Sequence, residues 1–103
     1  MRKLIFTRKW SIIESGSRIT LSVECDEAKC NAKFDDKFFM VMPIKNGETK
    51  EIEISENQTL ICLQSSTMDA EFVVPAGTSD VTLQAKPKFN PMQGNPFTIT
   101  EIK

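Results

Sequence analysis

Apolar and polar residues alternate one by one along several segments of this chain, and this period of two constrains the fold most. In residues 17–25 the apolar side chains fall on one face of an extended chain, namely Ile19, Leu21, Val23 and Cys25. Segments 51–54, 81–85 and 97–100 alternate in the same way. The chain also holds 24 Ile, Val and Thr residues against 10 Leu and Ala, and β-branched side chains favour a pleated sheet. These patterns predict a protein built from half-buried strands.

Polar turn signals separate the apolar runs at spacings of about 8–12 residues, which is typical of a sandwich or barrel. Lys45–Glu48 holds the Asn-Gly pair that tight hairpins favour. We therefore expect seven or eight strands in a single domain that covers residues 1–103. The expected architecture is an all-β, antiparallel β-sandwich with immunoglobulin-like or related Greek-key topology. The expected strands are 2–8, 17–25, 37–44, 48–54, 59–65, 69–74, 80–86 and 97–102.

Two of these strands are apolar on both faces, at Phe38–Met42 and Leu60–Leu63. Such a strand needs cover on both sides, from its own chain or from a partner. Pro43 has no N–H to give to a strand ladder, so we expect the end of the first of these strands to lie at a sheet edge or a bulge.

The middle third of the chain resembles small uncharacterised bacterial all-β domains. The likeness rests on Ile44–Ile54, where an Asn-Gly-Glu turn precedes an alternating strand, and on the apolar run Leu60–Leu63 that follows. The resemblance implies a β-sandwich of unknown role, and it transfers no functional residue to this chain.

The chain lacks the residues on which most enzymatic chemistry depends. It contains no His, which removes the usual general base, the serine triad and the commonest metal ligand. Glu51 and Glu53 share one strand face at a spacing that resembles a glycosidase pair, but their alternation with Ile52 and Ile54 predicts a solvent face. We therefore expect a protein that is not an enzyme and that holds no cofactor.

Three cysteines, an odd number, fit reduced thiols better than a disulfide framework. Cys25 and Cys30 approach the spacing of a zinc hook, but a structural zinc needs four ligands and the third thiol, Cys62, lies far along the chain. Cys25 and Cys62 instead follow the apolar positions of their strands, so we expect small buried side chains. A local Cys25–Cys30 bridge stays open if the protein is exported.

The first ten residues carry no acid and four basic side chains, Arg2, Lys3, Arg8 and Lys9. The whole chain has a net charge of −1, so we expect neither nucleic-acid nor membrane binding. The basic residues flank Leu4–Phe6 in the manner of charges that protect a terminal edge strand. Because neither a membrane span nor a signal peptide is present, we expect a cytoplasmic protein, with export after removal of a signal peptide left open.

Residues 86–96 form a long connection with three prolines, and loops of this length often carry binding residues. Our leading hypothesis is a non-enzymatic module that binds another protein or a second copy of itself, for example as a homodimer. The candidate partner-binding residues are Lys88, Phe89, Asn90, Met92 and Phe39. The alternative is a module that binds a small ligand or a carbohydrate on aromatic rings, for which Trp10 and Phe39 are available.

Overall fold

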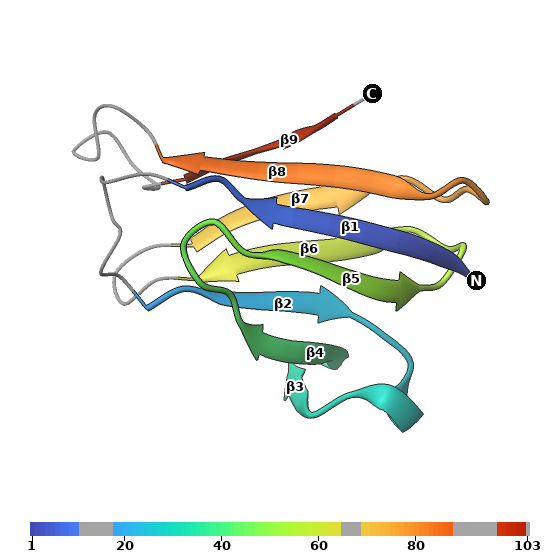
Figure 1. The fold of residues 1–103 in the computed structure, drawn as a ribbon. Helices are drawn as coiled ribbons and strands as arrows, with labels where there is room; N and C mark the ends of the chain where they lie inside the picture. Colours follow the sequence, from blue (N-terminus) through green and yellow to red (C-terminus); the bar gives the residue numbers. More distant parts are fainter. Residues whose placement is uncertain (11–17, 65–68, 88–96, 103) are drawn as a thin grey trace.

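Most of the described residues belong to strands in the computed structural model, which describes residues 1–10, 18–64, 69–87 and 97–102. Figure 1 shows the strands in chain order together with one short 3-10 helix, η1 (Glu27–Lys29). The strands are β1 (Arg2–Arg8), β2 (Thr20–Glu24), β3 (Ala32–Phe34), β4 (Lys37–Pro43), β5 (Thr49–Ile54), β6 (Thr59–Gln64), β7 (Asp69–Val74), β8 (Val81–Pro87) and β9 (Phe97–Glu101). Every expected strand forms, with ends displaced by a few residues, whereas β3 was not expected.

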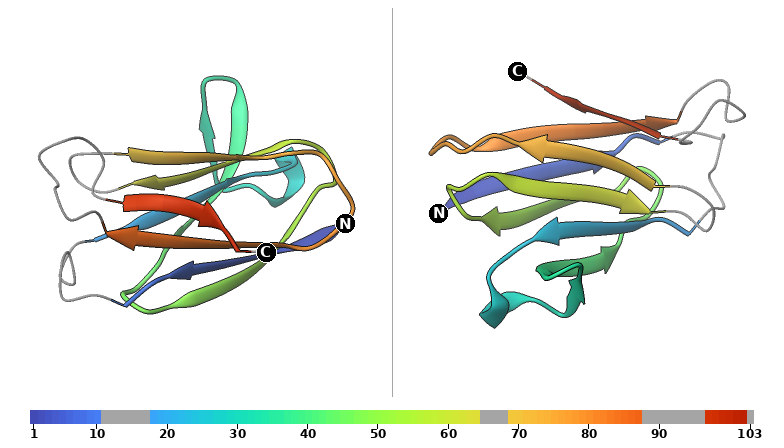
Figure 2. Two further views of the ribbon diagram at one scale, coloured as in Figure 1. Left: turned by 90° about the horizontal axis from the view of Figure 1, so that it is seen from above. Right: turned by 180° about the vertical axis from the view of Figure 1, so that it is seen from behind.

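The strands belong to two sheets, so the protein is all-β. The first sheet has the order β5-β1-β8-β9, and the second has the order β3-β4-β2-β6-β7. Neighbouring strands are antiparallel, except that β1 and β8 run parallel. The sheets form two layers, which Figures 1 and 2 show from three directions.

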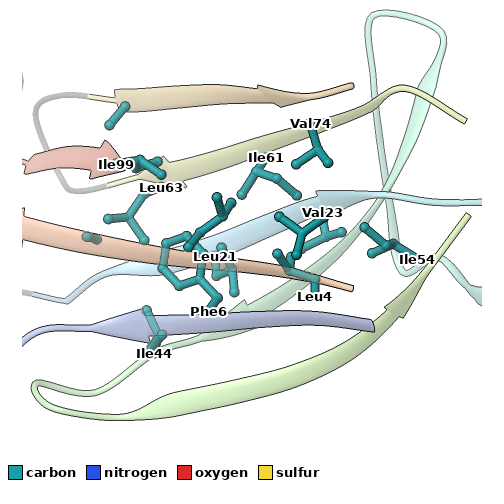
Figure 3. Close-up of a cluster of buried hydrophobic side chains, with 14 of the residues drawn as sticks. Leu4, Phe6, Leu21, Val23, Ile44, Ile54, Ile61, Leu63, Val74 and Ile99 are labelled. Carbon is teal, nitrogen blue, oxygen red and sulfur yellow. The ribbon is translucent and has the colours of Figure 1, made fainter. Parts of the chain in front are cut away.

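The core is built from alternate side chains of both sheets, as the period of two predicts. Leu4, Phe6 and Leu83 of the first sheet are fully buried. Leu21 and Ile61 of the second sheet are fully buried as well, and all five belong to one hydrophobic cluster (Figure 3). A single cluster shared by both layers explains why these short strands are stable together.

Strand β1 lies inside the first sheet, between β5 and β8, so the expected role of its basic residues at an edge is wrong. Arg2 and Arg8 fall on the same face as Leu4 and Phe6, and their side chains are only 4% and 2% exposed. Lys3 lies on the opposite face and is exposed. The two arginines are therefore buried and do not protect an edge strand from pairing.

The Asn-Gly turn connects the two sheets instead of closing a hairpin, because β4 belongs to the second sheet and β5 to the first. The Glu48 N–H donates to the Lys45 carbonyl at 2.9 Å. Gly47 has a φ of +81°, whereas Asn46 has no positive φ. A single left-handed residue at the third position is typical of a type II turn. The expectation of a tight hairpin here is therefore wrong.

Candidate functional site

The β3–β4 hairpin forms one wall of a groove on the outer face of the second sheet. Its turn consists of Asp35 and Asp36, which both lie in the left-handed region, with φ of 49° and 64°. Two such residues in succession are typical of a type I′ turn, whose twist matches that of antiparallel strands. In Figure 2 the hairpin projects beyond the other strands. It therefore gives the otherwise open face of the sheet a raised side.

The floor of the groove comes from residues of β2, β6 and β7 that point away from the core. Ser22 pairs with Cys62, which in turn pairs with Glu71, so these residues form one row across three strands. The groove has a volume of about 450 Å³. We call it the sheet groove, and it is lined by Ser22, Phe34, Asp35, Lys37, Phe39, Leu60, Cys62, Gln64 and Glu71.

Apolar side chains form much of the surface in and beside the sheet groove. The Phe34 and Phe39 rings lie with their centroids 6.0 Å apart and are tilted by 52°. Phe39 is only 5% exposed, whereas Phe34 is 53% exposed. Val73, which pairs with the lining residue Leu60, is 49% exposed. The groove is thus walled by a buried ring and bordered by large apolar side chains that face solvent.

Polar contacts hold the wall and floor of the sheet groove together. Glu24 of β2 accepts a hydrogen bond from the Leu60 N–H of β6 at 2.9 Å, through its Oε1 atom. Its other carboxylate oxygen lies 3.8 Å from Lys37 Nζ on β4. The Ser22 hydroxyl donates to Gln64 Oε1 at 3.4 Å. These contacts connect β2, β4 and β6 around the groove.

Of the five predicted partner-binding residues, only Phe39 belongs to the described part of the chain, where it lines the sheet groove. Lys88, Phe89, Asn90 and Met92 lie outside the described residues. Phe34 was missed, although it supplies the exposed ring. The sequence signal that could have identified it is Phe34 followed directly by Asp35 and Asp36, because two adjacent acids favour a turn and the turn brings the ring to the surface.

The two rings proposed for a carbohydrate platform lie in different places. Trp10 is 65% exposed and rests against the connection between β4 and β5. A Cβ atom added at Gly47 would lie 3.3 Å from Trp10 Cδ1. Phe39 lies in the sheet groove, which Trp10 does not line. The aromatic partner of Phe39 is Phe34 instead.

Cys25 and Cys62 are not the buried apolar side chains that we expected, and the Cys25–Cys30 bridge that was left open is present. Cys25 and Cys30 form a disulfide whose Cα atoms are 6.2 Å apart, and Cys25 is only half-buried. The bridge encloses η1 between β2 and β3. Cys62 is half-buried on the outer face of β6 and lines the sheet groove, because the inner face carries Ile61 and Leu63.

The paired carboxylates of β5 lie on the outer face of the first sheet, as expected. Glu51 pairs with Ile5 and Glu53 pairs with Lys3, and both carboxylates are exposed. Within the described ranges, no group of three His, Cys, Asp or Glu side chains is placed to hold a metal ion.

In the same ranges, no helix has the length and apolar character that crossing a membrane requires. No protein-family model, curated protein or solved structure matches this chain.

Proposed function

We propose that the chain is a non-enzymatic β-sandwich module that recognises another protein or a second copy of itself. The proposed topology is immunoglobulin-like or a related Greek key. A core shared by both sheets supports the sandwich. We propose the sheet groove as the recognition surface.

The observation that carries this proposal is the exposed apolar surface beside the sheet groove. Phe34 and Val73 are about half exposed; Phe34 lines the groove together with the half-buried Leu60, and Val73 is the strand partner of Leu60. Large apolar side chains gathered on one face mark interaction sites more often than scattered ones do. Aromatic residues that become buried at the centre of a protein interface also contribute a large share of its binding energy.

The apolar run on β4 supports this choice of surface, because its own chain covers much of it. Phe39 is buried, and Met42 packs against the core. Lys33 Nζ lies 5.4 Å from the centre of the Phe38 ring, which is half-buried. A second copy is therefore not required to cover this strand, and the surface in need of a partner is the one around Phe34.

The test combines Phe34→Ser with Val73→Ser, which remove apolar surface from the proposed interface. Ile102→Ser is the matched control, because Ile102 is 47% exposed and does not line the groove. Sedimentation equilibrium over a wide concentration range measures self-association. A photo-crosslinking amino acid at position 34 identifies a heterologous partner, whose affinity is then measured with purified components.

We expect the double variant to weaken the measured affinity at least about tenfold, which corresponds to about 1.4 kcal/mol, and the control to leave it unchanged. A protein that stays monomeric at all concentrations and yields no crosslinked partner would contradict the proposal. Equal losses in the double variant and in Ile102→Ser would contradict the choice of surface.

The alternative function is binding of a small ligand or carbohydrate, and the size of the sheet groove favours it. A volume of about 450 Å³ lies within the range of small-molecule sites, and two rings with a few polar groups suit such a ligand. A thermal-shift screen of glycans and metabolites tests it, since a bound ligand raises the melting temperature by mass action. A hit that Phe34→Ser abolishes would favour this alternative over protein recognition.

A further inference from the structure

A second pocket, which shares no lining residue with the sheet groove, lies at one end of the molecule. It has a volume of about 440 Å³. It gathers the end of β1, the start of β2 and the end of β4 with the turn that follows. Its lining residues are Arg8, Arg18, Ile19, Thr20, Pro43, Ile44, Lys45 and Asn46.

The charged side chains that line this pocket in the described part of the chain are all basic, namely Arg8, Arg18 and Lys45. Arg8 is 2% exposed, and its Nη1 atom donates to the Ile44 carbonyl at 3.0 Å. Arg18 and Lys45 are exposed, and neither forms an ion pair with the residues described. Three basic side chains therefore line one cavity.

The nearest acid on the neighbouring turn is engaged elsewhere. Glu48 Oε1 accepts the Lys45 backbone N–H at 2.9 Å, and Oε2 lies 3.4 Å from Lys50 Nζ. The Glu48 carboxylate therefore accepts the Lys45 backbone N–H and pairs with Lys50, and the Lys45 ammonium, which forms no ion pair with it, is attracted to it only at longer range.

Backbone hydrogen bonds connect the segments that form the walls of this pocket. The Ile44 N–H donates to the Ile19 carbonyl at 3.0 Å. The Arg8 N–H donates to the Glu48 carbonyl at 3.0 Å. Ile19 and Ile44 are buried, so they lower the dielectric constant beside the charges and strengthen their attraction for an anion.

We propose that this pocket binds an oxyanion, the phosphate or carboxylate group of a ligand. Arginine offers planar, paired donors that suit both groups, and lysine adds a point charge. The half-buried Thr20 and Asn46 line the pocket and have neutral polar side chains suited to hydrogen bonding with the same oxygens. This site is independent of the proposed protein recognition, because it lies on different residues.

The test compares sodium phosphate, sodium acetate and sodium chloride at equal ionic strength and pH. The melting temperature and the amide NMR shifts of Thr20 and Asn46 are followed as each salt is titrated. Arg18→Gln with Lys45→Gln removes two of the charges without touching the buried Arg8. Lys3→Gln with Lys86→Gln is the matched control, because both lysines are exposed on the first sheet.

We expect phosphate or acetate, but not chloride, to shift the Thr20 and Asn46 amides in a saturable way and to raise the melting temperature. The Arg18/Lys45 variant should weaken this binding at least about fivefold, and the Lys3/Lys86 variant should not. Tighter binding of phosphate points to a phosphorylated ligand, and tighter binding of acetate points to a carboxylate. Equal effects of all three salts, or equal losses in both double variants, would overturn the proposal.

Discussion

Arg2 is a buried cation that bonds to backbone carbonyls instead of an acid. Its Nε atom donates to the Ser55 carbonyl at 3.0 Å. Its Nη2 atom donates to the carbonyls of Asn57 at 3.1 Å and Pro75 at 2.8 Å. These carbonyls belong to the β5–β6 and β7–β8 connections, both of which pass from one sheet to the other. The guanidinium therefore links the two connections between the sheets, which lie outside the strands and their hydrogen-bond ladders.

Replacing this guanidinium should cost a large share of the free energy of unfolding. We expect Arg2→Met to lower it by about 2–4 kcal/mol, because three part-buried carbonyls lose a charged donor. Urea denaturation measures the change, and Lys3→Met is the control, since Lys3 is exposed on the same strand. A loss in Arg2→Met no larger than that in Lys3→Met would show that the bonds to the connections contribute little.

The β3–β4 hairpin is the element whose local conformation is most strained for its sequence. Asp35 and Asp36 have φ of 49° and 64°, and residues other than glycine are disfavoured there. Asparagine and glycine are the preferred pair at these two positions of a type I′ turn. The hairpin carries Phe34 and Phe39, so the strain is stored beside the sheet groove.

We therefore expect Asp35→Asn combined with Asp36→Gly to raise the free energy of unfolding by about 1 kcal/mol. Thermal and urea unfolding measure the gain. Glu56→Gly is the control, because Glu56 is an exposed turn residue without a positive φ and glycine should give no gain there. If the double variant is no more stable than the wild type, the turn imposes no strain in solution.

The disulfide is a second local constraint on the same hairpin, because it closes the segment that leads from β2 into β3. For a loop this short, the chain-entropy estimate of its stabilisation is about 2 kcal/mol. We expect Cys25→Ser with Cys30→Ser to lower the free energy of unfolding by up to that amount. Dithiothreitol should lower the stability of the wild type by the same amount.

Thiol counting makes the disulfide prediction specific. The unreduced, denatured wild type should expose one titratable thiol, Cys62, and the reduced protein should expose all three cysteines. Cys62→Ser is the control and should keep its sensitivity to dithiothreitol. Three thiols in the unreduced protein would contradict the bridge and would agree with the reduced thiols that the odd cysteine count favours.

For the molecule as a whole, the sequence predicts strands well and their neighbours poorly. Alternation marks which residues are extended, and it correctly places β2 and β5. It carries no information on which strands pair, so the parallel β1–β8 pair and the separation of β4 from β5 into different sheets were not foreseen. Long-range pairing depends on the shared core, which only the assembled chain reveals.

The candidate site shows the same limit. Phe39 was identified because it lies in an apolar run, whereas the exposed Phe34 was missed because β3 is short and follows a polar stretch. Arg2 and Arg8 were misjudged as edge charges, although the period of two already placed them on the face of Leu4 and Phe6. The sequence indicated the face correctly, and the burial of two arginines was unexpected because charged residues are seldom buried.

The pH dependence of stability is a property of the whole chain, and the absence of His simplifies it. Histidine is the side chain whose ordinary pKa lies between pH 5 and 8, so we expect the free energy of unfolding to stay nearly constant across that range. Urea unfolding at a series of pH values measures this. A slope near pH 6.5 would contradict the expectation.

Below about pH 5, protonation of Glu48 should lower the free energy of unfolding as the pH falls. The Lys45 backbone N–H bonded to its carboxylate lowers the pKa of Glu48 in the folded protein, and Lys50 adds to the effect. A carboxyl whose pKa is lower in the folded than in the unfolded state stabilises the fold above the unfolded pKa, and this contribution disappears as pH drops through the folded value. Glu48→Gln should therefore show a shallower loss of stability below about pH 4.5 than the wild type, while Glu51→Gln, on the exposed face of β5, should retain the full slope. If the free energy of unfolding falls equally below about pH 4.5 in Glu48→Gln and in the wild type, the turn does not depend on the Glu48 carboxylate.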